Sequence, residues 1–104
     1  SYGTIIAVES LRRGNYEGYS SLFIEIPFPI KKKGLHIQPA GRYIRAFYQE
    51  SPENAITCYQ KIFDFTSENG FILSGFSYEV IINENVIGRT EDAVVQIEIP
   101  IEKI

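Results

Sequence analysis

Residues 93–101 read Ala-Val-Val-Gln-Ile-Glu-Ile-Pro-Ile, and this stretch decides the fold of the chain. Its aliphatic residues fall on alternate positions, with the polar residues Gln96 and Glu98 between them. Because neighbouring side chains of a strand point to opposite faces of a sheet, the pattern predicts a strand with one buried face. That face is predicted to consist of Ala93, Val95, Ile97, Ile99 and Ile101.

Part of this stretch occurs twice, so the sequence contains an internal repeat. The tetrapeptide Ile-Glu-Ile-Pro stands at residues 24–27 and again at 97–100, and Ser-Tyr precedes it at residues 1–2 and 77–78. The order and spacing of these landmarks favour a duplication. A strand and a helix precede the second copy, so the repeat predicts a corresponding segment of about 40 residues upstream of Ser1 in a longer protein. The absence of methionine agrees with this prediction.

A strand followed by a helix is predicted between the two copies. Residues 42–48 are rich in aromatic and β-branched side chains, which suit a pleated surface. Ser51, Pro52 and Glu53 then provide a capping hydroxyl, a proline suited to the first turn and an acid at the positive end of the helix. Asn69-Gly70 is typical of a helix end. The buried stripe of this helix is predicted to contain Ala55, Ile56, Tyr59, Ile62, Phe63 and Thr66. Other strands are predicted at residues 4–8, 21–27 and 76–82, with a turn at 12–18 and a polar hairpin around Asn85 and Gly88.

Length and composition predict a single α+β domain. The chain has 104 residues, 44% of them hydrophobic and 22% charged, which is ordinary for a globular protein. We divide it into a first half-repeat (residues 1–30), a connector (31–40) and a second repeat (41–104), with antiparallel sheets. The first unit would lack its strand and helix in this chain. The net charge of −3 gives no general attraction to nucleic acid.

Few residues could support metal or redox chemistry. Cys58 is the only cysteine, so no intrachain disulfide forms, which fits a reducing, cytoplasmic location. His36 is the only histidine, so neither a histidine metal site nor a Ser-His-Asp triad is expected. The apolar runs are far shorter than the roughly 20 residues that span a bilayer, so no membrane association is expected. Lys31, Lys32 and Lys33 are read as a solvated connector. No cofactor is expected.

Four segments, in order, resemble the GyrI-like, or bacterial effector-binding, superfamily. They are Pro39-Ala40-Gly41-Arg42-Tyr43, Ser51-Pro52-Glu53, the stretch 77–82 and the stretch 96–101. The closest likeness is to the C-terminal multidrug-binding domain of MerR-family transcription activators, and it covers essentially the whole chain. This resemblance implies two pseudo-symmetric strand-helix-strand-strand halves around a cleft for a lipophilic, cationic small molecule. It further implies a non-enzymatic ligand sensor that contacts DNA only through a missing N-terminal domain, and it leaves open a homodimer of the intact regulator.

Glu79 is the first candidate for ligand contact. It interrupts the apolar run 76–82, and a buried carboxylate costs several kcal/mol unless it is compensated. A cationic ligand would compensate it, with aromatic rings adding about 0.5–2 kcal/mol. The residues alone favour the alternative that Glu79 lies on a solvent face or pairs with Arg42 or Arg45. The resemblance reverses this preference, because the family's acidic drug-binding residue falls on the Tyr78-Glu79 step.

The other candidate ligand contacts are large apolar or aromatic residues around the expected cleft, with simple core packing as the alternative for each. They are Tyr78, Tyr48, Ile81, Phe47, Tyr43 and Tyr59. Glu50, Ala55 and Ala93 stand where drug-sensing relatives carry pocket aromatics, which predicts a cleft that is wider or more polar near Glu50.

Two other functions stay open at this point. Some GyrI-like relatives hydrolyse strained electrophiles, and Glu79 could act as a general base beside a tyrosine hydroxyl. The second alternative is a protein-binding module of the gyrase-inhibitor kind, for which the net charge of −3 is weak support.

Overall fold

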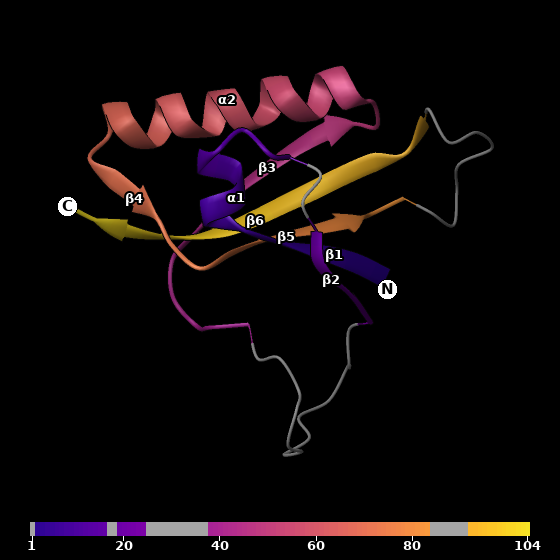
Figure 1. Cartoon of the computed structure of the whole chain (residues 1–104), viewed down its shortest axis with the longest axis horizontal. Coiled ribbons are helices and arrows are strands. Elements are labelled where there is room, and N and C mark those ends of the chain that lie inside the picture. Colours follow the sequence, from indigo (N-terminus) through magenta and orange to yellow (C-terminus); the bar gives the residue numbers. More distant parts are fainter. Residues whose placement is uncertain (1, 17–18, 25–37, 84–91) are drawn as a thin grey trace, which may run out of the picture.

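The strand predicted from residues 93–101 lies inside the sheet, with partners on both sides. In the computed structural model it is β6 (Val94–Lys103), which pairs with β3 (Tyr43–Gln49) on one side and with β5 (Phe76–Ile81) on the other. Both pairings are antiparallel. The structure describes residues 2–16, 19–24, 38–83 and 92–104 (Figure 1).

Two more strands extend the sheet beyond β5. β1 (Tyr2–Ala7) pairs with β5, and β2 (Tyr19–Ile24) pairs with β1, so the order is β2-β1-β5-β6-β3. The short strand β4 (Phe71–Leu73) pairs with the far end of β6, and the chain then passes through Ser74 and Gly75 into β5. The described chain is thus an α+β domain with a five-stranded antiparallel sheet and two helices, which confirms the predicted fold class.

α2 (Pro52–Glu68) covers one face of this sheet (Figure 1). The predicted start is confirmed, because the Ser51 Oγ accepts a hydrogen bond of 3.0 Å from the Asn54 N–H. After Asn69, Gly70 adopts a φ of +72°, which glycine reaches without steric cost and which ends the helix as predicted. The stripe is confirmed at Tyr59 and its buried neighbours, but Ile56 is 42% exposed. Ile56, about one turn before Tyr59, instead lines a pocket beside the start of α2.

A short helix in the first half was not predicted. The sequence indicated a strand to Val8 and a turn at 12–18, whereas α1 (Val8–Arg12) begins directly after β1. The Val8 N–H donates to the Gly75 carbonyl at 2.9 Å, and an Arg12 guanidinium nitrogen donates to the Leu73 carbonyl at 2.8 Å. Tertiary contacts with the β4–β5 connection therefore fix this helix, which is too short to produce a visible periodicity.

The core lies between α2, α1 and the covered face of the sheet. Ile6, Ile97 and Ile99 are fully buried, and Tyr59 reaches them from α2. The predicted alternation of β6 is confirmed by the burial of Ala93, Val95, Ile97 and Ile99. No helix in the described ranges is long and apolar enough to cross a bilayer. Residues 25–27 of the second predicted strand, Lys31 to Lys33, His36 and the hairpin around Asn85 and Gly88 lie outside the described residues.

The central position of β6 gives the first testable prediction. We expect Ile97→Ala to lower the free energy of unfolding by about 2–5 kcal/mol. Ile97 is fully buried, so removing most of its side chain leaves a cavity in the core. Ile104→Ala removes the same atoms from a side chain that is 81% exposed and serves as the control. Urea unfolding followed by circular dichroism measures both, and equal losses would contradict the assignment of β6 to the core.

Candidate functional site

Glu79 is held between α2 and β1 on the covered face of the sheet. Glu79 is only 7% exposed. Thr4 lies directly opposite it in β1 and donates from its Oγ1 to the Glu79 Oε1 at 3.4 Å. The Tyr59 hydroxyl, reaching down from α2, donates to the Glu79 Oε2. The carboxylate is therefore buried and hydrogen-bonded by neutral hydroxyl groups.

A chain of three side chains orients this contact. The Tyr59 and Ser77 hydroxyl oxygens are 2.8 Å apart, and Ser77 precedes Glu79 by two residues on the same face of β5. A tyrosine hydroxyl carries one proton. Tyr59 uses that proton in its hydrogen bond to the Glu79 carboxylate. Ser77 must therefore be the donor in the hydrogen bond between the Ser77 and Tyr59 hydroxyl groups. The order of donation is thus Ser77 to Tyr59 to Glu79.

Burial changes the acidity of both partners. It raises the pKa of Glu79 above the ordinary value of a glutamate, hydrogen bonds from Tyr59 and Thr4 act against this rise, and the charge of Glu50 adds to it. Burial also raises the pKa of Tyr59, and the Glu79 charge raises it further. Tyr59 therefore stays protonated beside the carboxylate. Because the charge of Glu50 acts on Glu79, the two acids are close enough to interact.

The two simpler interpretations of Glu79 are wrong. Its burial excludes a solvent face, and Arg45 instead pairs with Glu98, with 2.8 Å between the guanidinium nitrogen and the carboxylate. A second ion pair between described residues joins Arg12 to Glu9. Glu79 therefore has no ion-pair partner in the described part of the chain.

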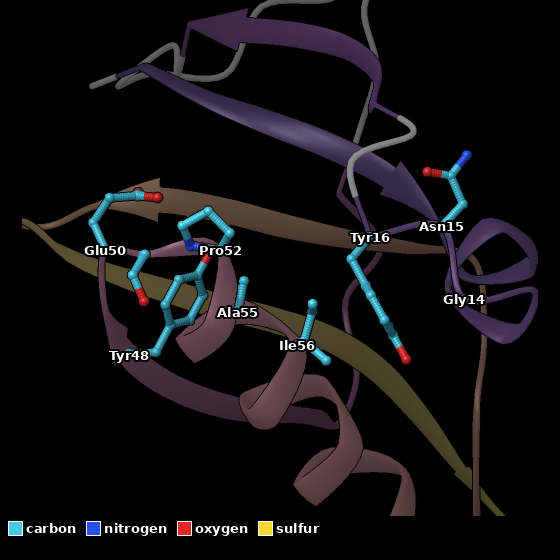
Figure 2. Close-up of a pocket in the computed structure, with 9 residues that line it drawn as sticks. Gly14, Asn15, Tyr16, Tyr48, Glu50, Pro52, Ala55 and Ile56 are labelled. Atoms are coloured by element: carbon cyan, nitrogen blue, oxygen red, sulfur yellow. The ribbon is translucent and has the colours of Figure 1, made fainter.

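A pocket of about 350 Å³ lies beside this carboxylate, between the start of α2 and the turn after α1. Figure 2 shows Tyr48 and Glu50 at the end next to Pro52, and Tyr16 at the other end. The rings of Tyr16 and Tyr59 are stacked, with centroids 5.4 Å apart and planes at 11°. Glu50 lines the pocket directly, whereas Glu79 is not among the lining residues and contacts Tyr59, whose ring stacks on the lining residue Tyr16. The pocket-lining residues in the described chain are Gly14, Asn15, Tyr16, Tyr48, Glu50, Ser51, Pro52, Ala55 and Ile56.

The structure brings together only some of the predicted ligand contacts. Tyr48 lines the pocket, whereas Tyr59 and Glu79 contact each other but are not among its described lining residues. Ile81 is on the same face of β5 as Glu79, two residues further along and opposite Val95, away from the pocket lining.

Tyr78, Phe47 and Tyr43 are on the opposite face of the sheet from Glu79 and are not among the described lining residues, so contact of these three with a ligand stays a prediction. Tyr78 adjoins Glu79 and Phe47 adjoins Tyr48, and adjacent residues of a strand point to opposite faces. Tyr43, five residues before Tyr48 in β3, shares the face of Phe47, and its hydroxyl donates to the Pro39 carbonyl. A ligand on the covered face would not contact these three rings.

Sequence reasoning missed Tyr16 and located Glu50 and Ala55. The latter two were singled out as departures from the pocket aromatics of drug-sensing relatives, and both line the pocket. Tyr16 follows Gly14, whose φ of +78° turns the chain back after α1. Its position depends on how α1 docks against Gly75, so no local pattern could have identified it.

Comparison with known proteins adds no relative, since no family model, curated protein or solved structure matches this chain. Within the described ranges, the histidine, cysteine, aspartate and glutamate side chains form no group of three that could hold a metal ion. Function must therefore be argued from the geometry of the pocket.

The raised pKa of Glu79 predicts a specific pH dependence of stability. Glu79 binds its proton more tightly in the folded chain, so folding stability falls as pH rises from about 4.5 through the folded-state pKa. Glu79→Gln does not titrate, so it should gain stability relative to wild type across this window. The gain should level off once the pH exceeds the folded-state pKa, because Glu79 is then ionised in both states. Urea unfolding from about pH 4 to pH 8 measures the difference.

Glu68→Gln removes one charge at an exposed position of α2 and controls for the change in net charge. Unfolding free energies of wild type and Glu79→Gln that run parallel across the window would show that the Glu79 pKa is not raised.

Proposed function

We propose that this chain is an effector-binding domain whose pocket takes a lipophilic cation, with Glu79 as counter-ion. The observation that carries the proposal is the pair of acids at one aromatic pocket. Glu50 lines it, and Glu79 contacts Tyr59, whose ring stacks on the lining residue Tyr16, while no arginine or lysine is among the described lining residues. A cation in this pocket would relieve the repulsion between the two carboxylates, which a neutral ligand could not do.

The size and lining of the pocket support a small organic molecule. A volume of about 350 Å³ lies within the usual range of about 300–1,000 Å³ for ligand pockets. Tyr16 and Tyr48 provide ring faces that attract a cation, and Ile56 and Ala55 provide apolar surface. Glu79 is only 7% exposed, so water screens its charge less than it would screen a surface carboxylate.

The order of the strands supports the proposed duplication. β1 and β5 begin the two copies of the repeat, and they pair antiparallel with each other. Each is flanked on its outer side by the strand that ends its own copy, β2 in the first and β6 in the second. The order of the strands is thus the same in the two hairpins, although their registers differ by one residue, since Tyr2 lies opposite Ile24 and Tyr78 lies opposite Glu98. On this basis we propose that the chain resembles the GyrI-like effector-binding domains in architecture, including the role of such domains as sensors in transcription regulators.

The proposal predicts selective binding of cations. Calorimetric titration with an aryl quaternary ammonium ion and its uncharged carbon isostere should show binding of the cation alone. Glu79→Gln should weaken it at least about tenfold, and Glu50→Gln should also weaken it. Affinity should rise with pH as Glu79 loses its proton, because the cation favours the carboxylate.

The matched control is Glu98→Gln, an acid on the opposite face of the sheet. Equal affinity for the cation and the isostere, or cation affinity unchanged in Glu79→Gln with its fold intact, would refute the role of Glu79.

One observation also favours a second candidate function, hydrolysis of a strained electrophile. The Tyr59 hydroxyl and the Glu79 carboxylate are in direct contact, as a general base and a proton donor to one substrate would be. Incubation with a small epoxide should then give a diol by mass spectrometry. Turnover should be lost in Glu79→Gln and in Tyr59→Phe but kept in Tyr16→Phe, and absence of any diol would dismiss this candidate.

A further inference from the structure

β3 is the last strand on one side of the sheet, and three of its residues, Tyr43, Arg45 and Phe47, direct backbone groups away from β6. The Glu50 N–H donates to the Ala93 carbonyl at 2.8 Å, and the Arg42 carbonyl accepts from the Ile101 N–H at 3.0 Å. Even-numbered residues of β3 therefore direct their backbone groups toward β6, and Tyr43, Arg45 and Phe47 direct theirs outward. In the described part of the chain, no backbone hydrogen bond reaches these three residues from outside the sheet.

One flank of α2 lies along the same edge. The Asn54 Nδ2 donates to the outward carbonyl of Gln49 at 2.8 Å, so the side of α2 that carries Asn54 faces the edge. Phe65 follows Asn54 by 11 residues, about three helical turns, and shares that side. Phe65 is 49% exposed, and Phe47 on β3 itself is 52% exposed. We call the outward backbone of β3 together with Phe47 and Phe65 the β3 edge surface.

The charges along β3 make this surface complementary to a second copy of itself. Arg42 and Arg45 are at the start of the strand, and Glu50 follows its end. Two such strands aligned antiparallel about Ala46 would place Arg42 of each copy opposite Glu50 of the other. A shift of the centre to Arg45 would instead place the two Arg45 side chains opposite each other, which is unfavourable. The charge pattern thus selects one register.

We propose that two copies of this chain associate through the β3 edge surface, with their β3 strands antiparallel and centred on Ala46. Arg45 of each copy would pair with Phe47 of the other through their outward N–H and C=O groups, Tyr43 would lie opposite Gln49, and the sheet would become continuous between the copies. Phe65 from each α2 would lie above the junction and lose its exposure to water. Glu50 also lines the pocket, so self-association and ligand binding share this residue.

The test exchanges the charges that set the register. Sedimentation equilibrium from micromolar to several hundred micromolar concentrations should show wild-type chain as dimer at the upper end. Arg42→Glu and Glu50→Arg should each weaken self-association at least about tenfold, because like charges then face each other twice. The double variant, and an equimolar mixture of the two single variants, should both recover dimers, since opposite charges face each other again.

Arg13→Glu, an exposed charge reversal at the end of α1, is the control and should dimerise like wild type. Amide hydrogen exchange at Tyr43, Arg45 and Phe47 should slow as wild-type concentration rises, which tests the interface even if a single variant fails to fold. A monomeric wild type throughout, single variants that dimerise as wild type does, or folded variants without recovery in the mixture would each overturn the proposal.

Discussion

The contact between Tyr59 and Glu79 is the constraint on which this structure depends. It places a carboxylate in the core, between the single long helix and the sheet. The site tolerates this acid because Tyr59 and Thr4 both bond to it, and among the described side chains no buried polar atom is left without a partner. Because Tyr59 also bonds Ser77 and stacks on Tyr16, one ring joins α2, β5 and the turn after α1. The fold and the pocket wall therefore depend on the same residue.

Local patterns in the sequence were sufficient for the elements that carry their own signal. The alternation from Ala93 to Ile101 predicted β6, and Ser51 with Pro52 predicted the start of α2, because these signals arise from neighbouring residues. α1 and β4 were missed for the opposite reason. Each is five residues or shorter, and hydrogen bonds from Val8 to Gly75 and from Ser74 to Pro100 fix their positions through distant parts of the chain.

The sequence was sufficient to single out Glu79, but it identified only some of the aromatic residues near the pocket. A charge inside an apolar run identifies Glu79 as unusual whichever face it occupies. Tyr78 and Glu79 are neighbours in β5, so their side chains point to opposite faces of the sheet. The same alternation in β3 puts Phe47 and Tyr48 on opposite faces. Tyr16 could not be found locally, since it reaches the pocket only through the turn at Gly14 and the docking of α1. The alternation of a strand predicts which face of the sheet a side chain occupies. Contacts between side chains of different helices and strands can be found only from the tertiary structure.

The proposed preference of the pocket for cations needs a physical reason, because the pocket is at the start of α2. Helix starts usually attract anions through free backbone N–H groups and the positive end of the dipole. Here Pro52 has no N–H, and the Asn54 N–H is already bonded to the Ser51 hydroxyl, so two of the first donors are removed. Glu50 precedes the helix and Glu53 lies in its first turn, and both oppose the dipole field. A bound anion would meet the Glu50 carboxylate in the lining, with Glu79 linked to the pocket through Tyr59 and Tyr16, which is the basis of the proposed preference for cations.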